Sequence, residues 1–523
     1  MSVSVNKNEC FTNPVLSGFY PDPSVCRVGE DYYLVTSSFS YYPGVPIFHS
    51  KDLINWRQLG HVLDRPSQLD LDNGGHSAGI YAPTIRYHQG KFYVITTNCT
   101  KGGNFIVTAD KPEGPWSDPY WLPNAPGIDP TLFFDDDGRV YYVGTHELPD
   151  GSYYGDNEIY LRELDLNTMT LKDPYYGLWR GALKKAVWSE GPHIYKLNGM
   201  YYLLIAEGGT DYHHAITIAR STNITGPYEG NPSNPILTHR HLGRNYPIVN
   251  TGHGDLIETQ NGEWWMVALA SRPYGGYYRN LGRETFLMPV IWEDGWPIVS
   301  PGTGKIEFQY KKPDLPAGEE VVLPQRDDFK DSDLGMIWNM IRTPRTQFWS
   351  LTDRPGYLRL KLRGEKLTDL ANPSFIGRRQ QHMNFISAAA MEFQPQHEGE
   401  AAGIALVQSN EYNLRMEYTL SEGRKVVQLI RCFNKEETVV ASQEFSGKEL
   451  IFKVSAIGQD YSFYFGTDEA NMTVLADKVN GSFMSTDVAG GFVGTYIGMF
   501  ASSNGAESNN HADFDWFEYS NQG

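Results

Sequence analysis

The stretch Gly29-Glu30-Asp31-Tyr32-Tyr33-Leu34-Val35 joins a glycine turn to an aromatic and apolar run, and the repetition of this pattern decides the fold. Further copies occupy residues 90–95, 138–143, 199–204 and 262–267. Their first glycines lie 61, 48, 61 and 63 residues apart. These intervals are too long for a solenoid repeat but suit a four-stranded blade with long loops. The pattern therefore predicts a five-bladed β-propeller; ordinary hairpins in one large sandwich are the alternative.

A second recurring element follows three of these copies. Residues 50–56, 109–116 and 220–228 each combine polar turn residues with a terminal aromatic residue. We interpret these segments as the outer strands of their blades.

The chain is 523 residues long, which exceeds the usual limit for one hydrophobic core and predicts two domains. The repeats predict a propeller over residues 1–305. Residues 306–325 are rich in proline, glycine and charge, as is typical of a linker. In the remainder, 326–523, the segments 357–362 and 426–430 suit half-exposed and buried strands and predict a β-sandwich. The fold class is thus all-β.

The composition restricts the classes of molecule that the protein is expected to bind. The formal net charge of -18 argues against nucleic acid, whose binding requires basic side chains, whereas a neutral ligand such as a sugar is compatible. No apolar run is long enough to span a membrane, and residues 1–7 lack the apolar core of a signal peptide, so a cytoplasmic protein is expected. The four cysteines, which we expect to be reduced structural thiols, are Cys10, Cys26, Cys99 and Cys432.

Three short segments place a carboxylate beside proline or glycine: 20–24, 127–131 and 189–193. Their acids are Asp22, Asp129 and Glu190. Proline favours an extended conformation in the residue before it, so Asp22 and Asp129 are expected on stiff, extended backbone. One Asp-Pro pair usually only starts a turn, but three matching contexts indicate chemistry. Glycosidic bond cleavage requires two carboxyl groups, and a third can tune the acid.

With these motifs the chain resembles glycoside hydrolase family 43, in the branch of β-xylosidases and α-L-arabinofuranosidases with a C-terminal sandwich. The resemblance rests on residues 13–24, 127–131, 190–196 and 281–285. It implies a five-bladed propeller with the active site at its axis, a concanavalin-like sandwich and an inverting mechanism. In that mechanism Asp22 would be the general base and Glu190 the general acid. Asp129 would orient Glu190 and raise its pKa.

The resemblance also implies residues that bind the sugar: Phe39, Tyr81, Ala82, Ile128, Thr210, His253 and Arg283. For Arg283, the alternative is a structural salt bridge with Glu284 or another acid. For His253, two further interpretations remain open, a core residue with satisfied hydrogen bonds or a residue that faces a metal near the axis.

The chemistry itself would need no cofactor. Asp328 and Asp515 match positions that bind calcium in related sandwich domains, so the resemblance implies a structural Ca²⁺ that ties the ends of that domain together. Solvated surface acids are the alternative.

The predicted function is exo-acting release of terminal α-L-arabinofuranose, and also β-D-xylose, from arabinoxylan-type or related hemicellulose oligosaccharides. Segments 250–253 and 274–283 look more like the arabinofuranosidase members than the xylosidase members. A xylan 1,4-β-xylosidase is the main alternative. A retaining fructan-type hydrolase and a propeller that binds carbohydrate without cleaving it are further alternatives. A homo-oligomer is compatible with the sequence.

Overall fold

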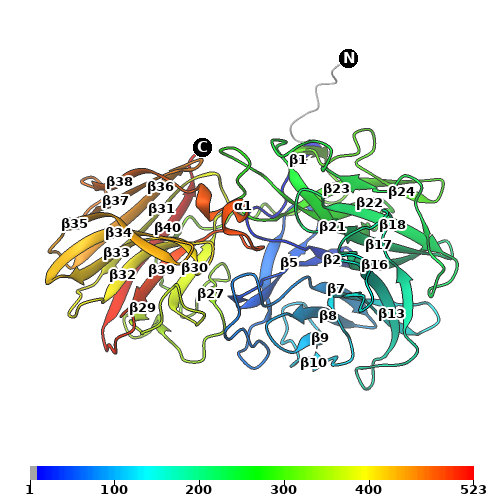
Figure 1. The fold of residues 1–523 in the computed structure, drawn as a ribbon, viewed down its shortest axis with the longest axis horizontal. Coiled ribbons are helices and arrows are strands. Elements are labelled where there is room, and N and C mark those ends of the chain that lie inside the picture. The colour runs from blue at the N-terminus through cyan, green and yellow to red at the C-terminus, as the bar shows by residue number, and fades with distance from the viewer. Residues whose placement is uncertain (1–8) are drawn as a thin grey trace, which may run out of the picture.

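The computed structural model describes residues 9–523 and has two halves, a propeller and a sandwich (Figure 1). The N-terminal stretch 1–7, on which the expectation about a signal peptide rests, lies outside the described residues. Apart from the 3-10 turn η2 (Ser482–Met484), the helical structure in the described part is α1 (Thr486–Ala489). No helix in residues 9–523 has the length and apolar character needed to cross a membrane.

The predicted five-bladed propeller is confirmed, because five separate antiparallel sheets follow one another along residues 24–299. In order of pairing, blade 1 contains β2 (Ser24–Val28), β3 (Asp31–Val35), β5 (Gly44–Ser50) and β6 (Arg57–Leu63); blade 2 contains β7 (Thr84–His88), β8 (Lys91–Asn98), β9 (Gly103–Ala109) and β10 (Tyr120–Trp121). Blade 3 contains β11 (Ile128–Phe134), β12 (Val140–Glu147), β13 (Asn157–Asp165), β14 (Thr170–Leu171) and β15 (Tyr176–Trp179). Blade 4 contains β16 (Glu190–Leu197), β17 (Met200–Glu207), β18 (Ala215–Ser221), β19 (Glu229–Gly230) and β20 (Leu237–Thr238); blade 5 contains β21 (Val249–Glu258), β22 (Trp264–Ser271), β23 (Glu284–Glu293) and β24 (Trp296–Val299).

The repeated glycines have one common role. Each lies in the turn between the first and second strands of its blade, with φ between +64° and +85°. Glycine adopts such positive φ values without steric cost. The aromatic run after each glycine is the second strand of the blade, where its side chains pack between neighbouring sheets.

The segments predicted as outer strands are instead turns. Residues 51–56 connect β5 to β6, and the other two segments likewise precede the outer strands β10 and β19. In the first turn, the Asp52 side chain accepts hydrogen bonds from the backbone N–H groups of Ile54 (2.9 Å) and Asn55 (2.8 Å). An aspartate that bonds the backbone in this way stabilises a turn and ends a strand.

Blades 1 and 5 meet through buried polar contacts. The Ser24 hydroxyl on β2 donates to Asp255 Oδ2 on β21 at 2.8 Å. Before β2, the Asn13 amide donates to the carbonyl of Leu287 on β23 and accepts from its N–H, each at 2.9 Å. The N-terminal segment therefore pairs with the last blade and closes the ring.

Part of the expected linker belongs to the propeller. Within residues 306–325, β25 (Gln309–Lys311) pairs antiparallel with β1 (Cys10–Thr12). Backbone pairing fixes this stretch, so it is not a free connection.

The C-terminal half is the expected concanavalin-like sandwich of two antiparallel sheets. One sheet contains β26 (Arg326–Asp327), β28 (Trp349–Ser350), β29 (Leu358–Lys361), β31 (Asn384–Glu392), β36 (Glu449–Ile457), β37 (Asp460–Gly466), β38 (Thr473–Asn480) and β40 (His511–Asn521). The other contains β30 (Ser374–Arg379), β32 (Ala401–Val407), β33 (Tyr412–Ser421), β34 (Arg424–Phe433), β35 (Glu436–Glu444) and β39 (Tyr496–Ser502).

The two halves share a core. Strand β4 (Tyr41–Tyr42) of the propeller pairs with β27 (Met340–Ile341) of the sandwich. The Tyr41 ring stacks on Tyr496 with centroids 3.7 Å apart. Arg342, 1% exposed, donates from Nε to the carbonyl of Gly74 at 2.6 Å. The domains are therefore packed together like parts of one hydrophobic core rather than joined only by a linker.

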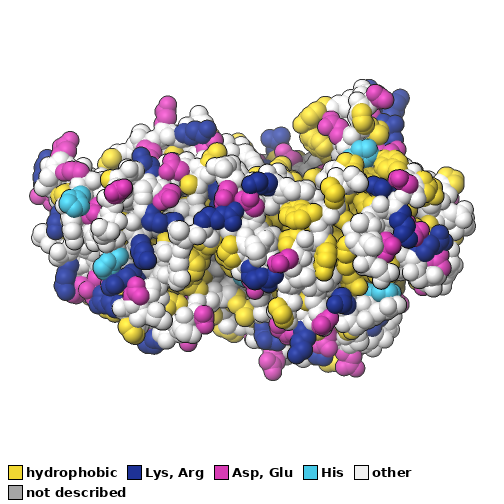
Figure 2. Space-filling view, turned by 90° about the horizontal axis from the view of Figure 1, so that it is seen from below, with side chains coloured by type: hydrophobic (Ala, Val, Ile, Leu, Met, Phe, Trp, Pro, Cys, Tyr) yellow, Lys and Arg dark blue, Asp and Glu magenta, His cyan; other side chains and the backbone are white. Residues whose placement is uncertain are grey.

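One face of the molecule is shown in Figure 2, where acidic and basic side chains are interspersed over the sandwich half. Hydrophobic side chains on that face gather in the middle and over the propeller half.

Candidate active site

The first strands of the five blades begin around the same end of the propeller axis. Asp22 and Ala82 each lie two residues before a first strand, β2 and β7 respectively. Asp129 lies near the start of β11, and Glu190 is the first residue of β16. His253 lies in the first half of β21. Because the blades share one topology, residues from the start of each first strand meet at the axis.

The carboxylates lie on irregular backbone. Asp22 and Asp129 both have φ of +53°, so the expectation that proline would keep them extended is wrong. The pairing register of β11 shifts between Ile128 and Thr131, and that of β16 shifts after Glu190. Such bulges turn a side chain out of the regular pleat, and strained φ values of this kind occur at functional sites.

All ten residues predicted for catalysis and sugar binding line one small pocket of about 90 Å³. The predicted residues are Asp22, Phe39, Tyr81, Ala82, Ile128, Asp129, Glu190, Thr210, His253 and Arg283. Two further side chains complete the lining, His214 and Phe492.

Asp22 is 5% exposed and strongly hydrogen-bonded. Arg283 Nη1 donates to its Oδ1 at 2.7 Å, and the Ser37 hydroxyl donates to its Oδ2 at 2.5 Å. Burial raises the pKa of Asp22, but the Arg283 charge and the hydrogen bond from Ser37 outweigh it, and the pKa lies below the usual value. Asp22 is therefore ionised at neutral pH.

The salt bridge considered for Arg283 is formed with Asp22, not with Glu284. Glu284 is bound by Arg272, whose Nε lies 2.7 Å from Oε2. Two nitrogens of Arg283, Nε and Nη2, are buried without a protein partner among the described residues. They are free to donate to an oxygen-rich ligand in the pocket.

Glu190 and Asp129 have the opposite electrostatics. Burial, and then repulsion from Asp22, raise the pKa of Glu190 to about 8. Burial, then repulsion from Glu190 and Asp22, raise the pKa of Asp129 as well. Because two close carboxyls repel, the pair retains a proton near neutral pH. Arg283 and the backbone N–H of Gly191, next to Glu190, only partly oppose this rise in the pKa of Asp129.

His253 lies between two of the acids, with Nδ1 4.0 Å from Asp22 Oδ1 and 4.0 Å from Asp129 Oδ2. Burial lowers the pKa of His253, so the ring is neutral at neutral pH. A Cβ on Gly191 would lie 2.8 Å from the ring, so this glycine gives His253 its space. Residues 9–523 contain no group of three or more His, Cys, Asp and Glu side chains arranged to bind a metal.

Of the two residues expected to bind calcium, one is paired with cationic side chains and the other is exposed. Both oxygens of Asp328 are engaged by cations, Oδ1 by Arg326 at 2.8 Å and Oδ2 by Lys330 at 3.0 Å. Asp515 is exposed and lies at a register shift of β40. Calcium at these residues stays a prediction, which melting curves with and without EDTA would test.

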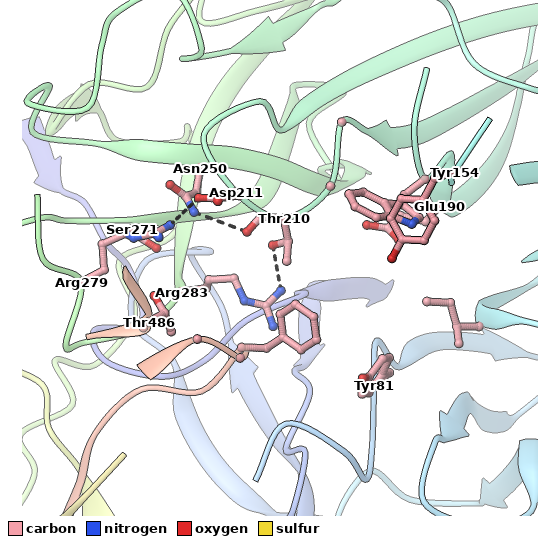
Figure 3. Close-up of a pocket in the computed structure, with 18 residues that line it drawn as sticks. Tyr81, Tyr154, Glu190, Thr210, Asp211, Asn250, Ser271, Arg279, Arg283 and Thr486 are labelled. Carbon is pink, nitrogen blue, oxygen red and sulfur yellow. Dashed lines mark hydrogen bonds and ion pairs between the residues drawn. The ribbon is translucent and has the colours of Figure 1, made fainter. Parts of the chain in front are cut away.

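A wider vestibule of about 530 Å³ adjoins the pocket and shares Glu190, Arg283 and Phe492 with it (Figure 3). Tyr154 and Trp188 form an aromatic wall of this vestibule, with ring centroids 5.3 Å apart. The Trp188 ring packs closely on Gly209, where a Cβ would lie 2.5 Å from the indole. This packing fixes the orientation of the Trp188 ring in the wall of the vestibule.

Two pocket residues were missed by the sequence interpretation. His214 donates from Nδ1 to the carbonyl of Asn250 at 3.0 Å, so its Nε2 is left as an acceptor without a partner. It lies four residues after Thr210, but a histidine in a loop is no recognisable motif. Phe492 belongs to the sandwich, from which no pocket residue was predicted.

Comparison with known proteins identifies the chain. The family model described as "Glycosyl hydrolases family 43" matches residues 11–297. The chain belongs to family 43 of the glycosyl hydrolases. A second model, "Beta xylosidase C-terminal Concanavalin A-like domain", matches residues 326–520 of this family 43 hydrolase. This membership excludes the fructan-type hydrolase and the propeller without catalysis.

Three relatives match nearly the whole family 43 hydrolase. A "Xylosidase/arabinosidase" from Butyrivibrio fibrisolvens is 48% identical over 97% of this chain and 98% of its own length. A "Non-reducing end alpha-L-arabinofuranosidase" from Bacteroides ovatus is 40% identical over 97% of this chain and 94% of its own. The crystal structure of a xylan β-1,4-xylosidase from Bacillus halodurans superposes with a TM-score of 0.92 at 37% identity, covering 97% of this chain and 99% of that one.

Proposed function

We propose that this glycoside hydrolase releases single terminal pentoses, α-L-arabinofuranose and also β-D-xylose, from hemicellulose-derived oligosaccharides by an inverting mechanism. The observation that carries the proposal is the small axial pocket, in which an ionised Asp22 faces two carboxyls with raised pKa values.

The roles follow from the protonation states. Asp22, ionised and fixed by Arg283 and Ser37, would take a proton from the water that attacks the anomeric carbon. Glu190, protonated near neutral pH, would donate its proton to the leaving oxygen. Asp129, which lines the same pocket, would orient Glu190, and repulsion between the two carboxyls would keep a proton on the pair.

The shape of the pocket supports exo action. Its volume is about 90 Å³, far below that of the adjoining vestibule, and apolar side chains such as Phe39, Ile128 and Phe492 enclose it. A pocket of this size suits one terminal sugar, whereas a through-going cleft would be needed to bind the middle of a chain. The vestibule would then receive the leaving group.

The names of the relatives support the release of both pentoses. The relatives from Butyrivibrio fibrisolvens and Bacteroides ovatus carry arabinosidase or arabinofuranosidase in their names, in agreement with the segments 250–253 and 274–283. Xylan 1,4-β-xylosidase as the main activity is the second candidate, since a structure with that name superposes on the whole chain.

Two experiments test the proposal. Initial rates with 4-nitrophenyl α-L-arabinofuranoside and 4-nitrophenyl β-D-xyloside, measured on one enzyme preparation, should show release from both and a higher kcat/KM for the arabinoside. Proton NMR in the first minutes of hydrolysis should show the released sugar with inverted anomeric configuration. A product that first keeps the substrate configuration would contradict the assignment of Asp22 as base.

A further inference from the structure

A loop of the sandwich reaches the active site. This docking loop, residues 481–495, contains η2 and α1 and lies at the junction of the two halves (Figure 1). Three of its residues, Thr486, Gly490 and Gly491, line the vestibule, and Phe492 lines both the vestibule and the pocket. The Phe492 ring centroid lies 6.0 Å from that of Phe39 and 6.2 Å from that of Tyr81.

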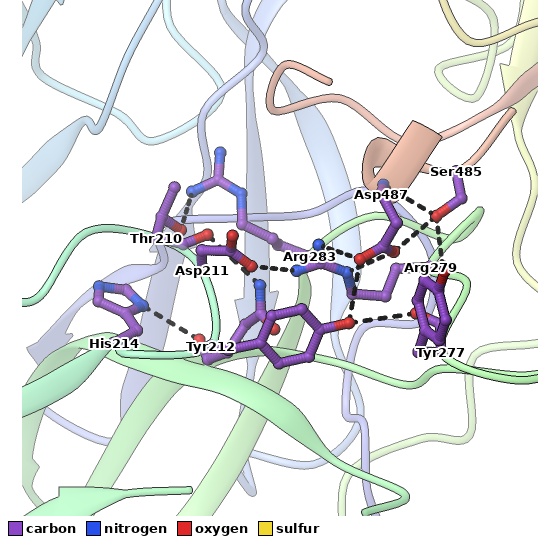
Figure 4. A network of polar contacts seen from close by, with 10 residues as sticks. Thr210, Asp211, Tyr212, His214, Tyr277, Arg279, Arg283, Ser485 and Asp487 are labelled. Carbon is purple, nitrogen blue, oxygen red and sulfur yellow. Dashed lines mark hydrogen bonds and ion pairs between the residues drawn. The ribbon is translucent and has the colours of Figure 1, made fainter. Parts of the chain in front are cut away.

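The docking loop is attached to the propeller by a buried ion pair, Arg279 with Asp487 (Figure 4). The contact is bidentate, because Nε lies 2.9 Å from Oδ2 and Nη2 lies 2.8 Å from Oδ1. The side chains are only 7% and 6% exposed. A parallel pair of charge-assisted hydrogen bonds fixes orientation as well as distance.

The same ion pair contacts the propeller loop that carries Thr210. Arg279 Nη1 donates to Asp211 Oδ1 at 3.2 Å, and its guanidinium lies 4.6 Å from the centre of the Tyr212 ring. The Tyr212 hydroxyl donates to Asp487 Oδ1 at 3.0 Å. Figure 4 shows these contacts together with the bond from Arg283 to the Thr210 hydroxyl.

At its other end, the docking loop is bound to the connection between blades 1 and 2. The N–H of Phe492 donates to the Ser77 hydroxyl at 2.8 Å, and the Phe492 ring lies 5.8 Å from the Arg283 guanidinium. Backbone contacts also hold the loop, since the Arg279 N–H donates to the Ser485 hydroxyl and the Asn280 amide donates to the carbonyl of Gly481. Among the contacts with the propeller, Asp487 supplies the charged one, and the aromatic wall of the pocket lies at the Phe492 backbone contact.

We propose that Arg279 and Asp487 are positioning residues, whose ion pair fixes the docking loop so that Phe492 closes the pocket around the terminal sugar. This inference rests on the proposed function. Pairing two buried charges contributes little net stability against their desolvation, whereas it specifies one geometry of the loop. Loss of the pair should therefore weaken sugar binding more than it slows the chemical step.

The competing explanation is that the ion pair of Arg279 with Asp487 only stabilises the contact between the two domains. A second ion pair between the domains provides a control for this explanation. Arg345 of the sandwich pairs with Asp70 at 2.9 Å and with Asp72 at 3.0 Å on the propeller, across the same domain junction. It lines neither the pocket nor the vestibule. Arg345→Ala therefore removes an ion pair between the domains without touching the docking loop.

The test measures kcat, KM, the inhibition constant of the free pentose and the melting temperature for Asp487→Asn, Asp487→Ala and Arg345→Ala in the full chain. For both Asp487 variants we expect KM and the inhibition constant to rise about tenfold, equivalent to about 1.4 kcal/mol, with kcat within about threefold of wild type. Arg345→Ala should leave both constants unchanged. If Asp487→Ala does not fold, Asp487→Asn, which keeps the volume of the side chain, carries the comparison.

A double-mutant cycle shows whether Asp487 acts through Phe492. In a Phe492→Ala background, Asp487→Asn should no longer change KM, and in the native background Asp487→Glu should restore part of the affinity. Additive effects of the two substitutions, or a fall in melting temperature with unchanged KM, would overturn the proposal. Failure of the proposed function is recognised separately, because the wild-type protein would then release no pentose from either aryl pentoside.

Discussion

At the scale of single residues, the site depends on strained backbone that places three acids in different surroundings. Asp22 and Asp129 each have φ of +53°, and the pairing register of β16 shifts directly after Glu190. Such conformations persist only where the surrounding structure enforces them. The consequence is that Asp22 meets Arg283, whereas Glu190 meets mostly apolar walls and like charge, so their pKa values move in opposite directions.

Substitution of the acids should separate their roles. Asp22→Asn is expected to reduce kcat by about 10²- to 10⁴-fold on every substrate, because the attacking water loses its base. Glu190→Gln should lose a similar factor on xylo- or arabino-oligosaccharides but much less on an aryl pentoside with an acidic phenol, which leaves without protonation. Steady-state rates on both substrate types measure this.

The control for these variants is the melting temperature, which should stay close to the wild-type value. Rates near wild type for Asp22→Asn would remove this residue from the mechanism.

The pH dependence should reflect the same two groups. Glu190 acts when protonated and its pKa is about 8, so kcat/KM should fall as the pH rises through about 8. Asp22 acts when ionised and its pKa is below 3.8, so little activity should be lost on the acid side until the pH approaches that range. An alkaline limb near pH 5 in the wild type would contradict the raised pKa of Glu190.

At the scale of elements, each blade brings one first strand to the axis, and the closure of the ring determines whether these strands meet. The closing contact is the N-terminal segment, whose Asn13 amide binds both backbone groups of Leu287 in blade 5. Asn13 is 2% exposed and Leu287 is fully buried. Buried backbone groups that lose their partner cost free energy, so this single side chain matters to the whole ring.

Asn13→Ala should therefore lower the free energy of unfolding by about 1–3 kcal/mol, seen as a melting temperature reduced by a few degrees. Activity at 25 °C should persist, because Asn13 touches no pocket residue. Asn167→Ala, at an exposed turn of blade 3, is the matched control and should leave the melting temperature unchanged. Equal melting temperatures of Asn13→Ala and Asn167→Ala would show that the contacts of Asn13 with Leu287 do not stabilise the closure of the propeller ring.

At the scale of the whole molecule, the two domains behave as one body. The strand pair of β4 with β27, the stack of Tyr41 on Tyr496 and the buried Arg342 all cross the junction. Phe492 then adds a sandwich side chain to a pocket whose acids belong to the propeller. A domain boundary drawn on sequence composition is therefore not a boundary in the packing.

Calorimetry should consequently show one unfolding transition for the full chain, because neither half can lose its structure without exposing the shared core. A variant that opens the junction, Tyr41→Ala, should lower that transition as a whole. Two well-separated transitions in the wild-type protein would contradict a shared core.

Local patterns in the sequence were sufficient for the fold and for most of the site. Glycine turns followed by aromatic strands specify five blades because turn chemistry and strand periodicity act over a few residues, and the Asp-Pro and Glu-Gly motifs identified the carboxylates in the same way. The tertiary structure alone decided the positive φ at Asp22 and the place of His214 and Phe492 in the pocket. These features depend on segments that are hundreds of residues apart in the chain and meet only through blade closure and domain docking, for which neither periodicity nor a short motif contains information.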